Sequence, residues 1–393
     1  MKYDFDKIIN RRDTYSIKYD LAGKGMAEDT IPLWIADMDF QSPPCVIEAL
    51  AKCVEHGIFG YSKPYENYYD IVKAWYKKRF NWTTEQEWVV ITSGVVVALH
   101  NAVNALSEPG DGVVIQQPVY QPFEASIKLT GRKLLINNLI YENNRYSIDF
   151  DDFEKKIKTA KLFILCNPHN PVGRVWTLEE LTRLGEICLK FGVKVIADEI
   201  HQDFIYKGHR HHVFANIDPA FADITVTCTS PSKTFNIAGL PHSNIFIKNK
   251  ELRKRFKQEQ TSNSPTHPGI MSFVSCMAAY EGGEDWLEEL LVYLAGNISL
   301  IRDKLERNTK EIKLVEPEGT YLAWLDCTGL GLEAKELDKQ IIHKAKLWLC
   351  GGAMFGTAGK GFQRVNTACP RSVLNEAVDR LLMSCQRDGP KGD

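Results

Sequence analysis

Apolar and polar positions alternate in blocks along most of the chain, and these blocks predict strands and helices in turn. From residue 89 to residue 247, short runs rich in β-branched residues recur between longer segments of helical periodicity. The predicted strands cover residues 89–91, 113–115, 133–136, 162–165, 193–197, 224–227 and 244–247. Helices are predicted between several of them, notably over 95–107 and 178–191. This order is typical of an α/β domain with a mostly parallel sheet, helices on both faces and a ligand at the carboxyl ends of the strands.

The two ends of the chain have a different pattern. Residues 31–40 form an apolar patch that two aspartates interrupt. A long amphipathic helix over 286–306 precedes two further strands, near 321–325 and 362–365. We therefore expect three parts: an N-terminal arm and helix (1–50) that pack on the small domain or a partner subunit, a large domain (51–284), and a smaller α+β domain (285–393).

The composition and charge of the chain limit the classes of binding partner that we expect. The 393 residues exceed what one hydrophobic core usually serves, and the net charge is −2 with both signs interspersed. Nucleic acid and anionic membrane surfaces are therefore excluded as expected partners. No window approaches eighteen uninterrupted apolar residues, and the ten cysteines include no C-x-x-C pair. We expect a soluble cytoplasmic protein with free thiols and no metal site.

One lysine lies among small hydroxyl residues directly after a predicted strand, in residues 229–240 (TSPSKTFNIAGL). At such a strand end Lys233 would point into a pocket, where burial lowers its pKa and leaves an amine that can condense with a carbonyl. The hydroxyls of Ser230 and Ser232 could donate hydrogen bonds to a phosphate. Pyridoxal 5′-phosphate (PLP) chemistry requires both features. The alternative for a loop lysine is ordinary solvation.

Two other strand ends offer complementary groups. The turn after the strand at 89–91 places Gly94 and Val95 at the start of a helix, where backbone N–H groups and the positive helix end favour a phosphate. Many serine–glycine turns between a strand and a helix look alike. Tyr120 follows the next strand and could stack on a flat heteroaromatic ligand. Ordinary packing in the core or at its rim is the alternative for this tyrosine.

Three more polar residues interrupt apolar or proline-rich surroundings. Asn170 lies between prolines that lack N–H donors, which leaves its amide free for a ligand. Asp198 follows the strand at 193–197, and a buried carboxylate at that place requires a cationic partner. A turn or helix cap is the alternative for both. Arg364 lies within an apolar strand and fits a bidentate contact with a carboxylate, or a structural ion pair.

In this order, the tyrosine, asparagine, aspartate, lysine and arginine resemble the site of the fold type I PLP enzymes, the aspartate aminotransferase superfamily. The resemblance covers nearly the whole chain and implies an aspartate aminotransferase-like α/β fold with a smaller α+β C-terminal domain. Within the superfamily, the chain is most similar to the MalY/PatB type of cystathionine β-lyase, or cysteine C–S lyase. The strings that carry this likeness are 36–40 (ADMDF), 56–61 (HGIFGY), 198–203 (DEIHQD), 232–236 (SKTFN) and 321–326 (YLAWLD).

The resemblance implies a role for each residue. Lys233 would hold PLP as a Schiff base, Asp198 would pair with the pyridine nitrogen, and Asn170 would bond the ring hydroxyl. Tyr120 would stack on the ring, and Arg364 would bind the substrate carboxylate. The phosphate would be held by Gly94, Val95, Ser230 and Ser232, with Tyr61 reaching it from the neighbouring subunit. A site shared between subunits implies a homodimer.

The implied reaction is a C–S β-elimination of L-cystathionine or an L-cysteine-type substrate. The freed Lys233 removes the Cα proton, the carbanion spreads into a ring that Asp198 keeps electron-poor, and a thiolate leaves from Cβ. Aminoacrylate then hydrolyses to pyruvate and ammonia. An aminotransferase on the same scaffold is the first alternative, because it shares both residues. A regulatory binding protein on a PLP fold is the second.

Three positions depart from the family pattern, and one segment resembles a metal site. His201 stands where aminotransferases commonly carry tyrosine, and its role is open. Pro241 replaces an arginine, which favours a lyase over a transaminase, and Gly351 replaces a proline of the lyases, which affects loop stiffness alone. Residues 209–212 (HRHH) look like a metal cluster but lack a carboxylate or cysteine ligand, so a solvated loop is expected.

Overall fold

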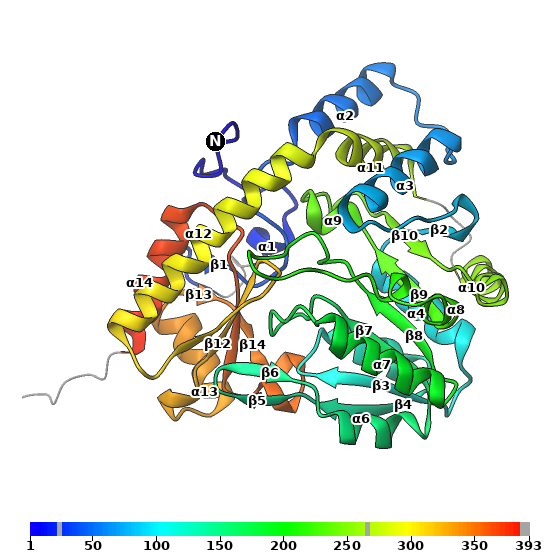
Figure 1. Ribbon diagram of the computed structural model, residues 1–393. Helices are drawn as coiled ribbons and strands as arrows, with labels where there is room; N and C mark the ends of the chain where they lie inside the picture. The colour runs from blue at the N-terminus through cyan, green and yellow to red at the C-terminus, as the bar shows by residue number, and fades with distance from the viewer. Residues whose placement is uncertain (22–25, 264–267, 386–393) are drawn as a thin grey trace, which may run out of the picture.

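A seven-stranded sheet forms the centre of the computed structural model, which describes residues 1–21, 26–263 and 268–385 (Figure 1). Its strands, in spatial order, are β2 (Val89–Thr92), β10 (Ser243–Phe246), β9 (Thr225–Thr229), β8 (Lys194–Asp198), β7 (Ala160–Cys166), β3 (Gly112–Gln117) and β4 (Lys133–Asn138). Strand β10 runs antiparallel to both of its neighbours, and the other pairs are parallel. The prediction of a mostly parallel sheet is confirmed.

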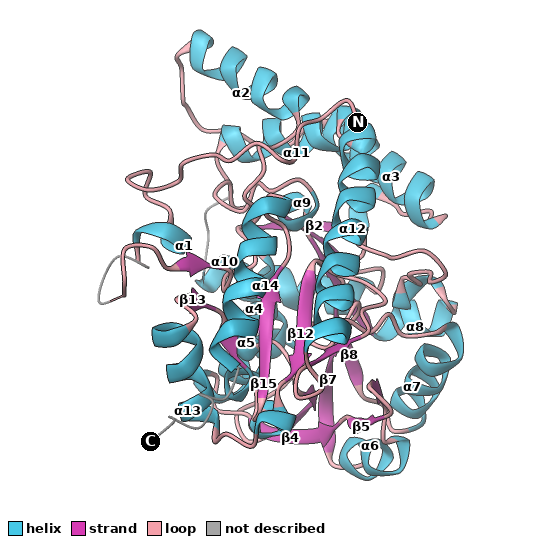
Figure 2. Ribbon diagram, turned by 90° about the vertical axis from the view of Figure 1, so that its left-hand side faces the viewer, coloured by secondary structure: helices cyan, strands magenta, loops and turns pink. Residues whose placement is uncertain are grey.

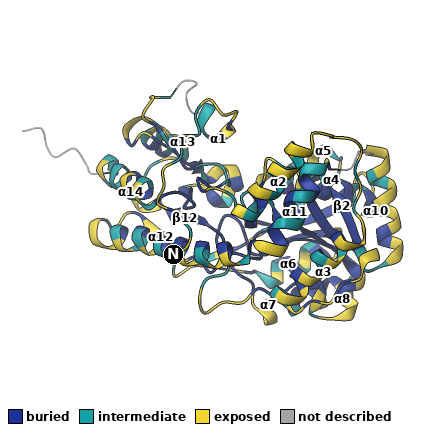
Figure 3. Ribbon diagram, turned by 90° about the horizontal axis from the view of Figure 1, so that it is seen from above, coloured by how far each residue is buried: buried dark blue, intermediate teal, exposed yellow. Residues whose placement is uncertain are grey.

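Helices cover both faces of this sheet, which explains why its strands read as continuous apolar runs. Successive residues of a strand point to opposite faces, and Val113 and Val114 are both fully buried. The face of Val113 packs against α4 (Val95–Leu106), α5 (Gln121–Leu129) and α10 (Lys250–Asn263). The face of Val114 packs against α6 (Phe150–Ile157), α7 (Leu178–Lys190) and α8 (Pro219–Ile224). Figure 3 shows the buried strands between helices whose outer faces are exposed.

The direction of the strands gathers the chemistry at one edge. Because β10 is the strand that runs against the others in this described sheet, the carboxyl ends of β2, β3, β7, β8 and β9 lie at the same edge. Ligands bind at this edge in open α/β sheets. Each of these five strands carries a predicted site residue at its carboxyl end or in the segment that follows it.

A further helical layer lies beyond the large sheet. It consists of α2 (Pro44–His56), α3 (Glu66–Phe80), α11 (Ile270–Gly282) and α12 (Glu284–Asn308). Tyr76, Phe273 and Trp286 are among the buried aromatic residues of this layer. Helix α12 runs from α11 towards α14 (Arg371–Cys385), beside the second sheet (Figure 1).

The second sheet is antiparallel and lies in the C-terminal part of the chain (Figure 2). Its strands, in spatial order, are β11 (Lys313–Val315), β12 (Leu322–Asp326), β15 (Phe362–Asn366) and β14 (Cys350–Gly351). One face packs on α12, α14 and α13 (Ala334–Lys339). The two strands predicted here correspond to β12 and β15. The domain boundaries at residues 50 and 284 stay predictions.

The N-terminal arm is tied to this second part of the chain. After the short helix α1 (Ile17–Asp20), strand β1 (Ile31–Pro32) pairs in parallel with β13 (Leu347–Trp348). The ring of Trp34 stacks on that of Trp348, with 4.3 Å between the ring centroids. The apolar patch seen in the sequence therefore packs inside this chain.

The structure also shows whether a helix could span a membrane and whether the cysteines form disulfides. Within the described residues, no helix is long and apolar enough to cross a membrane. All ten cysteines lie in the described part and are free thiols, as predicted.

Candidate active site

A cavity of about 520 Å³ lies at the carboxyl edge of the large sheet, and the second sheet closes one side of it. Eight of the predicted site residues form part of its wall: Gly94, Val95, Tyr120, Asn170, Asp198, Ser232, Lys233 and Arg364. These residues come from six different elements or turns and are up to 270 positions apart in the sequence. Asp198 and Lys233 therefore line the same cavity.

Lys233 lies in the four-residue helix α9 (Pro231–Thr234), directly after β9. Its Nζ donates a hydrogen bond to the backbone oxygen of Ala36, at 2.6 Å. Burial lowers the pKa of Lys233 to about 8, against an opposing contribution from the carboxylate of Asp37. A substantial fraction of this amine is therefore neutral near pH 8, and a neutral amine can act as a nucleophile and a base.

Asp198 is the last residue of β8, and only 4% of its surface is exposed. Its Oδ1 accepts a hydrogen bond from the backbone N–H of Ile200, at 3.1 Å, and the described residues offer it no ion pair. Burial raises the pKa of Asp198 to about 7, and the charge of Glu199 adds to this effect. A cation placed in the cavity beside the carboxylate would lower that pKa again.

The start of α4 also lines the cavity. Gly94 has a φ of +131°, a conformation that favours glycine, and a Cβ atom at this residue would meet no atom within 4 Å. Gly94 and Val95 bring the positive end of α4 to the cavity, and Ser232 lines the same cavity. This end suits an anion such as a phosphate.

Arg364 lies in the middle of β15 and has no carboxylate partner in the described chain. Its Nη1 donates to Oδ1 of Asn170 at 3.0 Å, and its Nη2 donates to the backbone oxygen of Trp34 at 2.8 Å. The Nε atom is buried without a hydrogen-bond partner. The guanidinium lies over the ring of Phe355, 4.9 Å from its centroid. An almost fully buried guanidinium without an anion fits the carboxylate of a ligand.

Two predicted residues are not on this wall. The hydroxyl of Ser230 donates to the backbone oxygen of His242 at 2.6 Å and accepts from the backbone N–H of Ser232 at 3.0 Å. It therefore caps α9. Tyr61 is fully exposed on the surface of this chain. The phosphate-binding role of both residues stays a prediction.

Several wall residues were given no role by the sequence patterns. His201 is 3% exposed, and burial together with the charge of Lys233 lowers its pKa to about 3, so the ring is neutral. Cys350 and Phe355 come from the second sheet and its flanking turn, where no motif marked them. Residues 34–36 also line the cavity, and the apolar patch around them was the available signal.

One expectation about the departures needs correction, and the one for Gly351 stays a prediction. A Cβ atom at Gly351 would lie 2.6 Å from Oδ1 of Asp338, which is the end of a side chain that can move. In residues 209–212, the solvated loop is wrong for His211, which is buried. Its Nε2 lies 3.1 Å from Oε2 of Glu199, the neighbour of Asp198.

The groups on the wall fit PLP. The unpaired buried carboxylate of Asp198 suits a cationic ring nitrogen, the amine of Lys233 suits an aldehyde carbon, and the open start of α4 suits a phosphate. The sheet, its strand order and these groups define the fold type I, aspartate aminotransferase-like fold, as the sequence predicted.

Comparisons with known proteins agree with this class. Residues 28–381 match the family model described as aminotransferase class I and II, and the chain belongs to that family. It is 41% identical to cystathionine beta-lyase PatB of Bacillus subtilis, over 96% of this chain and 98% of that protein. It is 32% identical to protein MalY of Escherichia coli, over 97% and 98%.

Solved structures show the same likeness. Cystalysin from Treponema denticola, which contains a pyridoxal 5′-phosphate cofactor, is 40% identical, with a TM-score of 0.95 over 98% of this chain and 99% of that one. The PLP-bound C–S lyase from Staphylococcus hominis is 35% identical, with a TM-score of 0.91 over 98% of each chain. The predicted family and its likeness to the MalY/PatB type are confirmed.

Proposed function

We propose that this protein is a PLP-dependent C–S β-lyase. It cleaves L-cystathionine or an L-cysteine-type substrate into a thiol, pyruvate and ammonia. The observation that carries the proposal is the single cavity in which Lys233, the unpaired Asp198 and the unpaired Arg364 meet. The whole-length similarity to PatB, MalY and two C–S lyases of known structure supports cleavage of a carbon–sulfur bond.

The cavity wall provides a group for each part of the cofactor. Lys233 would attach it covalently, Asp198 would pair with the ring nitrogen, Asn170 would bond the ring hydroxyl, and Tyr120 would pack on the ring. The phosphate would be held by the N–H groups of Gly94 and Val95 and by Ser232, with Ser230 supporting α9. When bound, PLP supplies an electron sink for the negative charge that develops at the substrate Cα.

The remaining steps belong to residues of this chain. The guanidinium of Arg364 binds the substrate carboxylate, which orients the Cα–H bond towards Lys233. The neutral amine of Lys233 accepts the Cα proton, and its lowered pKa makes this possible near pH 8. The sulfur then leaves from Cβ as a thiolate. The neutral ring of His201 adds no charge to this part of the wall.

Incubation of the purified protein with L-cystathionine and no keto acid tests the proposal. A lyase releases pyruvate and homocysteine in equal amounts over many turnovers. An aminotransferase stops after one half-reaction, with the cofactor converted to its aminated form, and that result would replace the proposal. Turnover far below about 1 s⁻¹ on cystathionine, cysteine and a bulky thioether would favour the regulatory alternative.

A homodimer with shared sites is part of the proposal. The loop between α2 and α3 exposes Ile58, Phe59 and Tyr61, with 71%, 59% and 112% of their surfaces accessible in the single chain. An exposed apolar group of this kind marks an interface. In a dimer, Tyr61 of one copy reaches the phosphate end of the other.

Subunit hybrids test this sharing. Y61A and K233A variants each have defective sites, but a mixed dimer contains one site with both native residues. Co-expression of the two variants should restore up to about a quarter of wild-type activity, since half of the dimers are mixed and each has one intact site. No recovery in a preparation that contains mixed dimers would contradict a shared site.

We also propose a cytoplasmic location. Ten free thiols, seven of them buried, suit a reducing compartment. Cell fractionation with a compartment marker tests the proposal, and recovery of the protein outside the cytoplasm would contradict it.

A further inference from the structure

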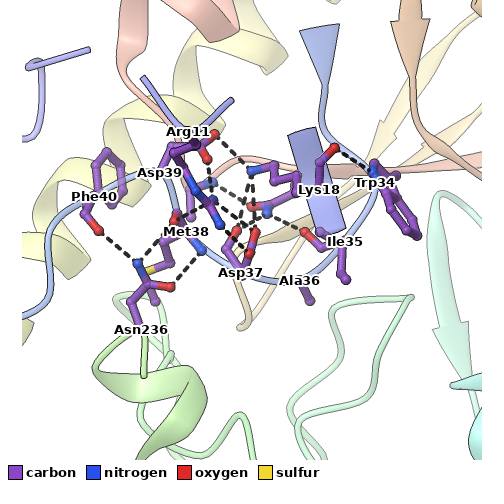
Figure 4. Close-up of polar contacts among 12 residues, drawn as sticks. Arg11, Lys18, Trp34, Ile35, Ala36, Asp37, Met38, Asp39, Phe40 and Asn236 are labelled. Atoms are coloured by element: carbon purple, nitrogen blue, oxygen red, sulfur yellow. Dashed lines mark hydrogen bonds and ion pairs between the residues drawn. The ribbon is translucent and has the colours of Figure 1, made fainter. Parts of the chain in front are cut away.

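Residues 34–40 form a segment, here called the strap, whose first three residues line the cavity. Figure 4 shows the polar contacts of this segment. Asn236 fastens one end of the strap. Its Oδ1 accepts from the backbone N–H of Met38 at 2.9 Å, and its Nδ2 donates to the oxygens of Met38 at 3.0 Å and Phe40 at 2.8 Å. Three hydrogen bonds from one side chain fix both the distance and the direction of this segment.

Asn236 is also tied to the lysine loop. It lies three residues after Lys233 and has a φ of +55°, a left-handed conformation that asparagine tolerates better than most residues. Its backbone oxygen accepts a hydrogen bond from Ser42, just beyond the strap, at 3.0 Å. Asn236 therefore joins the loop that carries the lysine to the segment that faces it.

The other end of the strap is held from the second sheet. Asn366 of β15, which is fully buried, donates from Nδ2 to the backbone oxygens of Ile35 at 2.7 Å and Asp37 at 2.5 Å. Both asparagines thus act on the few residues on either side of Ala36. The strap is fixed from two sides of the cavity.

The acidic side chains of the strap are paired with two cations of the N-terminal arm (Figure 4). Arg11 binds Asp37 and Asp39, at 2.7 Å each. Lys18, whose surface is fully buried, binds Asp39 at 2.8 Å. Removing one partner from such a buried cluster leaves an uncompensated charge and destabilises the fold. The cluster therefore keeps the strap in place.

These anchors place one carbonyl group at the reactive amine. The backbone oxygen of Ala36 accepts hydrogen bonds from Nζ of Lys233 at 2.6 Å and from the hydroxyl of Tyr321 at 3.0 Å. A lysine side chain has four rotatable bonds, so an amine without such a partner would occupy many positions. The bond to Ala36 selects one of them.

We infer that Asn236 and Asn366 are positioning residues for the proposed reaction, because they hold the Ala36 oxygen where it captures the amine of Lys233 whenever that amine is not bound to the cofactor. The inference rests on the proposed role of Lys233 as the base. A neutral amine has N–H bonds and one lone pair. One N–H donates a hydrogen bond to the Ala36 oxygen, and the lone pair remains available to accept a proton from the substrate.

The proton transfer balances without any further reactant. The Cα–H bond breaks, its electron pair stays on the substrate carbon, and the proton forms a third N–H bond on Lys233. The resulting ammonium binds the Ala36 oxygen more strongly than the amine did, because a charged donor makes the stronger hydrogen bond. The strap therefore stabilises the product of the proton transfer as well as placing the base.

The first test measures backbone hydrogen exchange in the cofactor-free protein. N236G keeps a left-handed backbone favourable and removes the three bonds to the strap, while K233M removes the amine. Each should raise exchange in residues 35–39 by about 3- to 10-fold, the worth of a hydrogen bond. Because both act on one segment, the double variant should show less than the product of the two factors.

N137A provides the matched control. Asn137 is a buried asparagine with three hydrogen bonds, to Gln116, Asp149 and Asp152, and it lies away from the cavity wall. Its substitution should leave exchange in residues 35–39 unchanged. The inference is overturned if N236G does not raise this exchange, or if the factors of N236G and K233M simply multiply.

The second test measures kinetics per molecule of bound cofactor, which removes any loss of folded protein. N236G and N366A should each lower kcat about 10-fold or more, because a misplaced base costs rate, while KM changes by less than about 2-fold. With substrate deuterated at Cα, the isotope effect should be at least as large as in the wild type, since proton removal has become slower.

An unchanged kcat, or an isotope effect that falls towards one, would overturn the positioning role. The exchange experiment needs neither cofactor nor substrate. A failed lyase assay with the expected exchange pattern would therefore reject the proposed reaction and leave the contact between the strap and Lys233 established. Lyase activity in a protein whose N236G and K233M variants do not show the expected exchange pattern would support the proposed reaction and reject the positioning role of the strap.

Discussion

Arg174 and Arg364 are both buried arginines, with 1% and 5% of their surfaces exposed, but their surroundings differ. Arg174 binds Glu318 and Glu180, each at 2.9 Å, and also donates to the backbone oxygen of Tyr146. Arg364 has a side-chain amide, a backbone oxygen and a thiol as partners, with no carboxylate among the described residues. The first arginine is satisfied by the protein itself, and the second lacks an anion that a substrate can provide.

The carboxylates of Glu318, beside Arg174, and Asp198, in the cavity, also differ in whether the protein supplies a partner of opposite charge. Burial alone would raise the pKa of Glu318, but the hydrogen bond and charge of Arg174 outweigh it, and the pKa is lowered. Asp198 has no such partner, and burial raises its pKa to about 7. The Arg174 network is therefore expected to support stability, while the cavity groups support activity at some cost in stability.

Removal of the amine should have the largest effect. K233A should lower kcat on L-cystathionine by about 10⁴-fold or more, because the chain loses both the attachment point and the base. Its unfolding free energy without cofactor should equal or exceed that of the wild type, since a buried amine is removed. K190A, which alters an exposed lysine paired with Glu154, is the control for both measurements.

Loss of a carboxylate from the Arg174 network should affect stability instead. E318A leaves the Arg174 guanidinium with one fewer anion and should lower the unfolding free energy by about 3 kcal/mol, measured by urea denaturation. The kcat per molecule of bound cofactor should stay within about 2-fold of the wild type. A large loss of kcat with unchanged stability would show that the two regions are not separate.

The cavity arginine should give a smaller effect, confined to ligands that carry a carboxylate. R364K replaces a two-pronged contact with a single ammonium and should lower kcat/KM by about 10- to 100-fold. Inhibition by an amino-acid thioether should weaken by a similar factor. Inhibition by the corresponding amine without a carboxylate should not change, and an equal loss for both inhibitors would reject carboxylate binding by Arg364.

The pH dependence of stability should have opposite signs for the two carboxylates. The pKa of Glu318 is lowered on folding, so its contribution is present above its unfolded pKa and is lost as the pH falls through the folded value. The pKa of Asp198 is raised, so its ionisation destabilises the cofactor-free fold as the pH rises towards about 7 and above. Glu318 binds a proton more tightly in the unfolded state, and Asp198 binds one more tightly in the folded state, so the two signs are opposite.

Urea titrations of cofactor-free protein measure these signs, at pH 5 and pH 8 for Asp198 and at pH 3 and pH 6 for Glu318. D198N should raise the unfolding free energy by more at pH 8 than at pH 5, with a difference of roughly 2 kcal/mol, because the wild-type carboxylate is ionised mainly at the higher pH. E318Q should lower the unfolding free energy by more at pH 6 than at pH 3. The same sign for both variants would contradict the comparison.

The sequence predicted the large sheet well because both of its faces are buried. Val113 and Val114 face different helical layers, so the apolar run was unbroken and easy to recognise. The hairpin of β5 (Ile140–Glu142) and β6 (Arg145–Ser147) was missed. Its signal was the pair Asn143 and Asn144, both with positive φ, which suits the tight turn of a hairpin.

The site was predictable where a residue follows directly from its strand. Asp198 and Lys233 come at strand ends, and parallel strands place such ends together. The contact between Lys233 and Ala36 joins residues 197 positions apart and depends on how the strap packs, which no local pattern specifies. Ser230 was ambiguous for a different reason, because one hydroxyl can serve a helix start or a ligand.

The most direct test of the account asks where the cofactor is attached. The PLP-loaded protein is reduced with borohydride, digested, and its peptides are analysed by mass spectrometry. The account predicts that the cofactor mass is found on the peptide containing Lys233, and that K233A yields no modified peptide. Attachment at any other lysine, or no attachment in a protein that cleaves cystathionine, would contradict it.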